Sequence, residues 1–116
     1  MSARVIEAVN TMISHRENIS SVIKNGSEYI FCYMDKYVWG ITKIKDPSDY
    51  ALFYYPNSGS TQELATVTDW NKISFVAYSS KEIGTPEARS SMEELMTVVQ
   101  EKLHGVDEIL DRIISG

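Results

Sequence analysis

The chain has 116 residues, of which 43% are hydrophobic and 23% are charged, and its formal net charge is −5 at pH 7. This length suits one ordinary core, so we expect residues 1–116 to form a single domain. The acidic balance disfavours nucleic acid as a partner, because phosphate contacts dominate that affinity. No apolar run approaches the roughly 18 residues of a membrane span. The lone cysteine excludes an internal disulfide, and we expect a cytoplasmic protein that binds no membrane.

The N-terminal residues predict a helical segment. Between residues 3 and 13 the apolar side chains recur at three- and four-residue spacing, which places them on one helix face. These residues are Val5, Ile6, Val9, Met12 and Ile13. The apolar spacing continues to residue 23, which leaves open one helix to Lys24 or two helices joined at Ser14. Gly26 would end this segment, because glycine tolerates the left-handed conformation of a helix end.

From Glu28 the apolar period changes to two. Residues 28–34 and 37–44 are rich in aromatic and β-branched side chains, and Asp35-Lys36 separates them. This pattern predicts an antiparallel hairpin with a two-residue loop, which would place Met34 opposite Tyr37.

The same register makes two further predictions along the hairpin. Glu28 would lie opposite Lys43, where opposite charges favour the pairing. Phe31 would lie opposite Gly40 and cover the space that the glycine leaves in the sheet.

After a turn at residues 46–49, residues 50–55 predict a third strand. The next segment is ambiguous. Residues 60–63, Ser-Thr-Gln-Glu, fit the capping box of a short helix, whereas residues 64–68 also fit a strand. We favour a strand over residues 62–68, because residues 73–78 could follow it in a second hairpin.

The C-terminal third predicts a long amphipathic helix from Thr85 to Ile114. Thr85 can cap its start, and Pro86 suits the first helical position. Its apolar stripe consists of Met92, Val99, Val106 and Ile113, with Met96, Leu103 and Leu110 four residues after the first three. Gly105 is typical of a helix end, yet the stripe keeps its phase across it. Either the helix breaks near Gly105, or a second protein covers its last turns.

Together these elements predict an α+β fold. It has an N-terminal helical segment, an antiparallel sheet of three to five strands, and a long amphipathic C-terminal helix.

Few residues suggest chemistry. The two histidines, His15 and His104, lack the spacing of a metal site, and the loop at residues 57–61 lacks the lysine of a P-loop. Cys32 should be a small core residue in mid-strand. We therefore assign no catalytic, cofactor-binding or metal-binding residue, and an enzymatic activity is disfavoured.

Two apolar groups are candidate interfaces. Strand alternation places Tyr29, Phe31 and Tyr33 on one face of the sheet. The N-terminal helix could cover one sheet face and the C-terminal helix the other, or the tyrosine-rich face could meet a partner. The second group, near the end of the long helix, is Val106, Ile109, Leu110, Ile113 and Ile114.

These features predict a small acidic cytosolic interaction or regulatory module without catalytic activity. We expect it to form a homodimer or to bind another protein. The alternative is a small-ligand-binding domain or minor enzyme, with a tyrosine-lined pocket between sheet and helix that includes the loop at 57–61.

Overall fold

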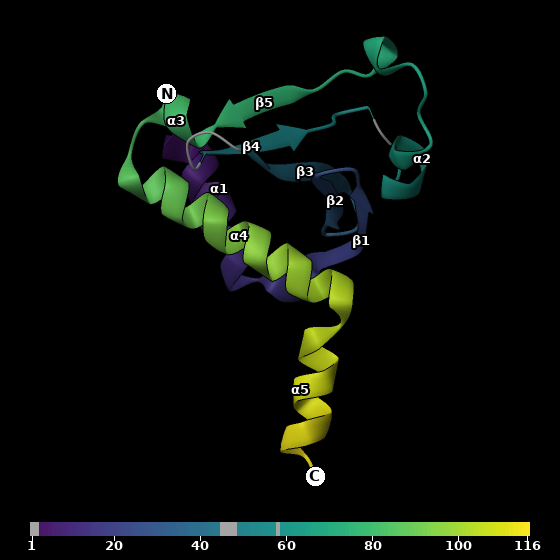
Figure 1. Ribbon diagram of the computed structural model, residues 1–116, viewed down its shortest axis with the longest axis vertical. Helices are drawn as coiled ribbons and strands as arrows, with labels where there is room; N and C mark the ends of the chain where they lie inside the picture. The colour runs from purple at the N-terminus through teal and green to yellow at the C-terminus, as the bar shows by residue number, and fades with distance from the viewer. Residues whose placement is uncertain (1–2, 45–48, 58) are drawn as a thin grey trace.

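The computed structural model describes residues 3–44, 49–57 and 59–116, and their strands form a five-stranded antiparallel sheet (Figure 1). The strands are β1 (Ile19–Asn25), β2 (Glu28–Tyr33), β3 (Tyr37–Ile44), β4 (Asp49–Tyr54) and β5 (Val76–Ser79). The helices are α1 (Ala3–Ser14), α2 (Thr61–Ala65), α3 (Ser80–Ile83), α4 (Pro86–His104) and α5 (Val106–Ile114), with short 3-10 turns η1 (Arg16–Asn18) and η2 (Trp70–Lys72). The predicted α+β fold is confirmed.

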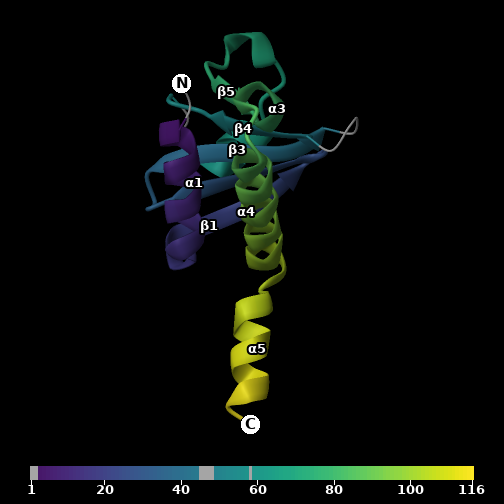
Figure 2. The same cartoon turned by 90° about the vertical axis from the view of Figure 1, so that its left-hand side faces the viewer.

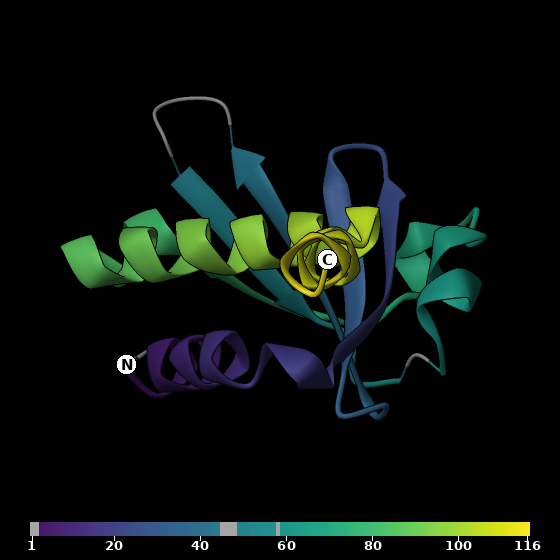
Figure 3. The ribbon, with the colours of Figure 1, turned by 90° about the horizontal axis from the view of Figure 1, so that it is seen from below.

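The strands lie in the sheet in their sequence order, β1-β2-β3-β4-β5, so each one pairs with its chain neighbour. Helices α1 and α4 lie side by side across one face of this sheet (Figures 2 and 3). The prediction that these two helices cover opposite faces is therefore wrong. The apolar sides of both helices are buried against the same face, because the five-stranded sheet is wide enough to hold two helices.

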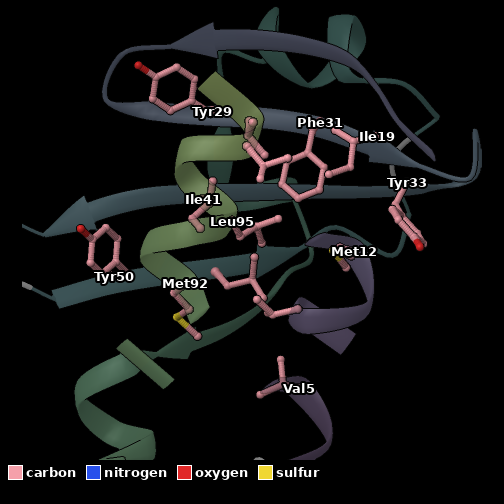
Figure 4. Packing of buried hydrophobic residues seen from close by; sticks show 14 of the residues in the cluster. Val5, Met12, Ile19, Tyr29, Phe31, Tyr33, Ile41, Tyr50, Met92 and Leu95 are labelled. Atoms are coloured by element: carbon pink, nitrogen blue, oxygen red, sulfur yellow. The ribbon is translucent and has the colours of Figure 1, made fainter. Parts of the chain in front are cut away.

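The main core fills the space between this face and the two helices. Figure 4 shows Met12 of α1 and Leu95 of α4 pointing toward the strands that carry Phe31 and Ile41. The most deeply buried members of this cluster are Val9, Phe31, Ile41, Leu52, Ala88, Met92, Leu95 and Val99. The helical spacing in the sequence and the alternation of β2 thus identify the same core from its two sides.

The segment at residues 19–25 is a strand, so the helical prediction to Lys24 is wrong. The reason is a β-bulge: the pairing of β1 with β2 shifts between Ser20 and Ile23, and Ser21 has a positive φ of 53°. An extra residue in a strand turns a two-residue spacing into a three-residue one. The apolar residues of β1 therefore mimic a helical period.

The hairpin of β2 and β3 forms as predicted, but its register differs by one residue. Tyr33, not Met34, lies opposite Tyr37, so the loop has three residues. The amide of Lys36 donates to the carbonyl of Tyr33 at 3.3 Å. Met34 and Asp35 both adopt positive φ values, 59° and 56°, which few residues other than glycine and asparagine do. Because Met34 and Asp35 are residue types that rarely adopt this conformation, the sequence predicted the shorter, two-residue loop.

The corrected register moves both predicted cross-strand partners. Glu28 lies opposite Thr42 rather than Lys43, and Phe31 lies opposite Trp39 rather than Gly40. Glu28 and Lys43 consequently project from opposite faces of the sheet, because successive side chains alternate.

A double charge reversal tests this register. We expect Glu28→Lys and Lys43→Glu to change the free energy of unfolding additively, within about 0.5 kcal/mol, because the side chains do not meet. Urea denaturation of the single and double variants measures the coupling. Glu28→Lys with Thr42→Glu is the matched pair that should show a favourable coupling. If the double variant at residues 28 and 43 recovered stability instead, the result would support the register with the two-residue loop.

Residues 61–65 form a helix, so the preference for a strand over 62–68 is wrong. The Ser60 hydroxyl accepts a hydrogen bond from the amide of Glu63 at 3.1 Å and caps α2. Leu64 is buried against Ile30 and Val38 on the sheet face opposite α1 and α4. β5 pairs with β4 instead of with residues 62–68.

The long C-terminal helix breaks at Gly105, one of the two outcomes that the sequence left open. Gly105 has φ 65° and ψ 30°, a left-handed conformation that suits glycine, and it ends α4 while α5 begins at Val106. After the break α5 projects away from the sheet and helices (Figure 1). Within residues 3–44, 49–57 and 59–116, no helix combines the length and apolar character that crossing a bilayer requires.

Candidate functional site

Helix α5 presents an apolar surface to solvent. This α5 apolar surface consists of Val106, Ile109, Leu110, Ile113 and Ile114. Ile113 and Ile114 are 70% and 82% exposed, and no residue of α5 is buried. The other side of the helix carries Asp107, Glu108, Asp111 and Arg112. A strongly amphipathic helix with its apolar side in water is typical of an unfilled interface.

The start of α5 is tied to the body by one arginine. Arg16 Nη2 donates to Glu101 Oε1 of α4 at 2.7 Å and to Asp107 Oδ1 of α5 at 3.2 Å. The hydrogen bond to Glu101 and the two acidic charges outweigh desolvation and raise the pKa of the Arg16 guanidinium. This shared cation fixes where the first turn of α5 leaves α4.

The structure separates the two predicted groups of interface residues. Tyr29, Phe31 and Tyr33 are buried beneath α1 and α4, and Phe31 is fully inaccessible. The Tyr29 hydroxyl accepts a hydrogen bond from Gln100 Nε2 at 3.4 Å. The tyrosine-rich face therefore belongs to the core, whereas the α5 apolar surface is accessible to solvent.

The opposite face of the sheet carries a cavity of about 510 Å³. We call it the aromatic cavity; its lining is Asn25, Gly26, Ser27, Glu28, Thr42, Phe53, Tyr55, Trp70 and Phe75. The alternative prediction, a small-ligand-binding domain or minor enzyme, has a tyrosine-lined pocket between sheet and helix. The observed cavity includes one tyrosine, Tyr55, but it lies on the other face, and its lining includes neither residue 57 nor residues 59–61.

Four rings from three chain segments line this space, which is open to solvent. Phe53 lies in β4 and Tyr55 directly follows this strand, Trp70 belongs to η2, and Phe75 directly precedes β5. The ring centroids of Phe53 and Phe75 are 5.7 Å apart in an edge-to-face arrangement, and those of Tyr55 and Trp70 are 6.3 Å apart. Because aromatic pairs stabilise each other at such distances, the rings support one another around the space.

A carboxylate lies among these rings. The half-buried Glu28 accepts a hydrogen bond from the Tyr55 hydroxyl. Gly40 makes room for it, since a Cβ atom there would lie 1.8 Å from Glu28 Oε2. Burial raises the pKa of the Glu28 carboxyl, an effect that the hydrogen bond from Tyr55 partly offsets. Burial and the adjacent carboxylate likewise raise the pKa of Tyr55.

Little in the amino-acid sequence indicated this cavity. The sequence predicts Phe53 and Tyr55 in a strand, but it predicts their neighbours Trp70 and Phe75 within a second hairpin. The relation of Glu28 to Gly40 was hidden by the register error, because the predicted hairpin paired Glu28 with Lys43. The available signal for this cavity was the presence of aromatic residues before and after the irregular segment that follows β4.

The other candidates have structural roles. Asp49, which was predicted to be a turn residue, is buried and accepts hydrogen bonds from Ser79 and Ser80 and from two amides. Cys32 is half-buried rather than fully buried. Burial raises the pKa of its thiol, and the negative charge of the nearby Asp35 raises it further. His15 is exposed beside Glu17. In the part of the chain that the structure describes, no cluster of His, Cys, Asp or Glu could hold a metal ion.

Comparisons of this chain with protein-family models, with curated proteins and with solved structures find no match. The α5 apolar surface and the aromatic cavity are the features of the described residues that bear on function.

Proposed function

We propose that this chain is a small acidic cytosolic protein-interaction or regulatory module, without catalytic activity of its own, that forms a homodimer through the α5 apolar surface. The observation that supports it is the exposure of large apolar side chains along one side of α5. Full burial of one such side chain contributes roughly 1.5–3 kcal/mol. Covering the outer parts of five of them would therefore contribute several kcal/mol to association.

The charges of α5 favour an antiparallel, two-fold arrangement. Its first turn carries Asp107 and Glu108, and its last turn carries Arg112. In a parallel pair the acidic ends would meet and repel each other. In an antiparallel pair the acidic first turn of one helix lies beside the end of the partner helix that carries Arg112, so the two ends attract each other instead. A surface that is complementary to itself in this way suits the two-fold symmetry of most homodimers.

The size of α5 limits the affinity. A helix of nine residues is about 13.5 Å long at roughly 1.5 Å per residue. Its contact area is below the roughly 800 Å² per partner of a standard interface. We therefore expect a dissociation constant on the order of micromolar, since small interfaces of this kind are usually transient.

Sedimentation velocity between about 1 and 200 μM tests the proposal across the expected dissociation constant. We expect the mass to rise from 13.1 kDa toward twice that value with concentration. Leu110→Ser with Ile113→Ser should keep the chain monomeric, because both side chains are exposed and contribute little to the single chain's own core. The matched control is Val76→Ser, which removes a similarly exposed apolar side chain from β5 and should leave the dimer intact.

The orientation has its own variants. Arg112→Glu should weaken the dimer a few-fold, and adding Glu108→Arg should restore part of the affinity, because the facing ends of the two helices then carry opposite charges again. A wild-type chain that stays at 13.1 kDa throughout the concentration range would contradict self-association. A dimer that survives Leu110→Ser with Ile113→Ser would place the contact elsewhere.

A further inference from the structure

The aromatic cavity combines two features that suit a positively charged ligand. Its walls are four aromatic rings, and the faces of such rings attract cations, Trp most strongly. Its lining contains no Lys, Arg or His, and Glu28 supplies its one formal charge. The one formal charge of the lining is therefore negative, although the surface of the cavity is mainly carbon.

The carboxylate of Glu28 lacks a charged partner. Within the described residues it accepts a hydrogen bond from Tyr55, and it forms no ion pair with a Lys, Arg or His. A half-buried carboxylate without a counter-charge is unfavourable, as the raised pKa of Glu28 indicates. A cation in the cavity would relieve this cost.

The chemistry of the lining selects among cations. A divalent metal ion would need several oxygen ligands, whereas the cavity offers one carboxylate and a few neutral polar groups. A primary ammonium or guanidinium group carries three or five N–H donors that need acceptors, and ring faces do not provide them. A trimethylammonium group has no N–H donor, and its methyl groups pack against aromatic carbon. It fits the lining best.

We propose that the aromatic cavity binds an organic cation with a trimethylammonium group, which lies against Trp70, Phe75 and Phe53 with Glu28 as its counter-charge. The volume of about 510 Å³ falls within the range of small-ligand pockets. No residue of α5 lines the cavity, so this binding is independent of the proposed dimer.

Two sources carry this chemistry: a free quaternary ammonium compound and a trimethylated lysine side chain of another protein. Choline and a short peptide with one trimethyllysine represent them. Binding of the peptide about tenfold or more tightly than choline would identify the protein-borne source, and equal or weaker binding of the peptide would identify the free compound. Either result supports the cation site.

Nuclear magnetic resonance provides a local readout, because the chain has two tryptophans. Trp70 lines the cavity, whereas Trp39 packs against the core on the other face of the sheet. Titration with choline should shift the indole N–H signal of Trp70 and leave that of Trp39 in place. The control ligand is 3,3-dimethyl-1-butanol, which has the same shape without the charge. We expect it to bind at least about tenfold more weakly.

Three variants separate charge, ring face and position. Glu28→Gln keeps the side-chain shape but removes the charge, and should weaken choline binding about tenfold. Trp70→Leu keeps an apolar side chain but removes the ring face, with a similar expected loss. Gly40→Ala keeps every lining residue and displaces the Glu28 carboxylate, because the new Cβ would occupy its place. Glu94→Gln on α4, an exposed acid outside the cavity, should have no effect.

Thermal unfolding of each variant shows whether it is folded before binding is compared. Equal binding of choline and 3,3-dimethyl-1-butanol would overturn the proposal, because the cavity would then recognise shape alone. Absence of a Trp70 shift with choline and with the trimethyllysine peptide up to about 10 mM would also overturn it. So would unchanged choline affinity in folded Glu28→Gln and Trp70→Leu proteins.

Discussion

Replacing Phe31 with Ala should lower the free energy of unfolding by about 3–5 kcal/mol. Phe31 is fully inaccessible to solvent and lies in the core cluster that α1 and α4 cover. Its truncation removes a large apolar group and leaves a cavity that the surrounding helices and strands can fill only in part. Urea denaturation at neutral pH measures the change.

Phe75→Ala is the matched control, because the same truncation is made at a side chain that is 52% exposed. We expect it to cost less than about 1 kcal/mol. If Phe31→Ala cost as little as Phe75→Ala, then α1 and α4 would not cover this sheet face in solution. The tyrosine-rich face would then be open to a partner.

The second large effect is expected at Asp49, which joins the start of β4 to the β5–α3 junction. Its carboxylate accepts hydrogen bonds from the amides of Tyr50 and Lys81, each at 2.8 Å, and from the Ser79 hydroxyl at 3.0 Å and the Ser80 hydroxyl. Asp49→Ala removes the acceptor of the Lys81 amide and of both serine hydroxyls in a buried place. The Tyr50 amide keeps a second acceptor, the Ser80 hydroxyl at 3.0 Å. We expect the substitution to cost about 2–3 kcal/mol at pH 7.

The acid side of the stability profile follows from the same hydrogen bonds. Burial by itself raises the pKa of the Asp49 carboxyl, but the donors of Ser80, Lys81, Tyr50 and Ser79 together outweigh it and lower the pKa. A lowered pKa in the folded state means that the ionised form stabilises the fold above the unfolded pKa of roughly 3.9. This contribution is lost as the pH falls through the folded pKa.

Chemical denaturation between about pH 2 and pH 7 should therefore show a steeper loss of stability in the wild type than in Asp49→Ala. Asp69→Ala is a suitable control, because Asp69 caps η2 at an exposed position and accepts a hydrogen bond from the Asn71 amide at 3.1 Å. It should cost about 1 kcal/mol. Parallel pH profiles for the wild type and Asp49→Ala would contradict the assigned role of this carboxylate.

The sequence predicted well those elements whose pattern is local and uninterrupted. The apolar stripe of α4 and its cap were predicted correctly. The Thr85 hydroxyl accepts a hydrogen bond from the Ala88 amide at 3.1 Å. The apolar face of α1 and the strand β4 were also correct in type. In the two helices one period holds through the whole element, so that packing and pattern agree.

The failures in β1 and in the hairpin share a physical cause, which is a positive φ at residues other than glycine. Ser21 shifts the alternation of β1, and Met34 and Asp35 lengthen the hairpin loop by one residue. None of the three is a glycine, so composition does not mark these positions. Because a shift of one residue moves every side chain to the other face, a local exception changed the predicted partners of the whole hairpin.

The candidate surfaces were predictable to different degrees. The apolar residues of α5 could be identified from their spacing alone, since α5 needs no distant partner to define its face. The aromatic cavity could not, because it depends on the hairpin register and on the path of residues 66–75 back to the sheet. Glu28, Gly40 and Tyr55 meet only when three strands are aligned correctly.

The placement of α1 and α4 on one sheet face has a consequence for synthesis on the ribosome. Each strand pairs with its chain neighbour, so the hairpins can form as the chain emerges. The face that carries Phe31, Ile41 and Leu52, however, is completed by a helix from the other end of the sequence. Until α4 has left the exit tunnel, a nascent chain displays this apolar face half uncovered. Such an interval is when an unfinished polypeptide is most exposed to aggregation and to capture by chaperones.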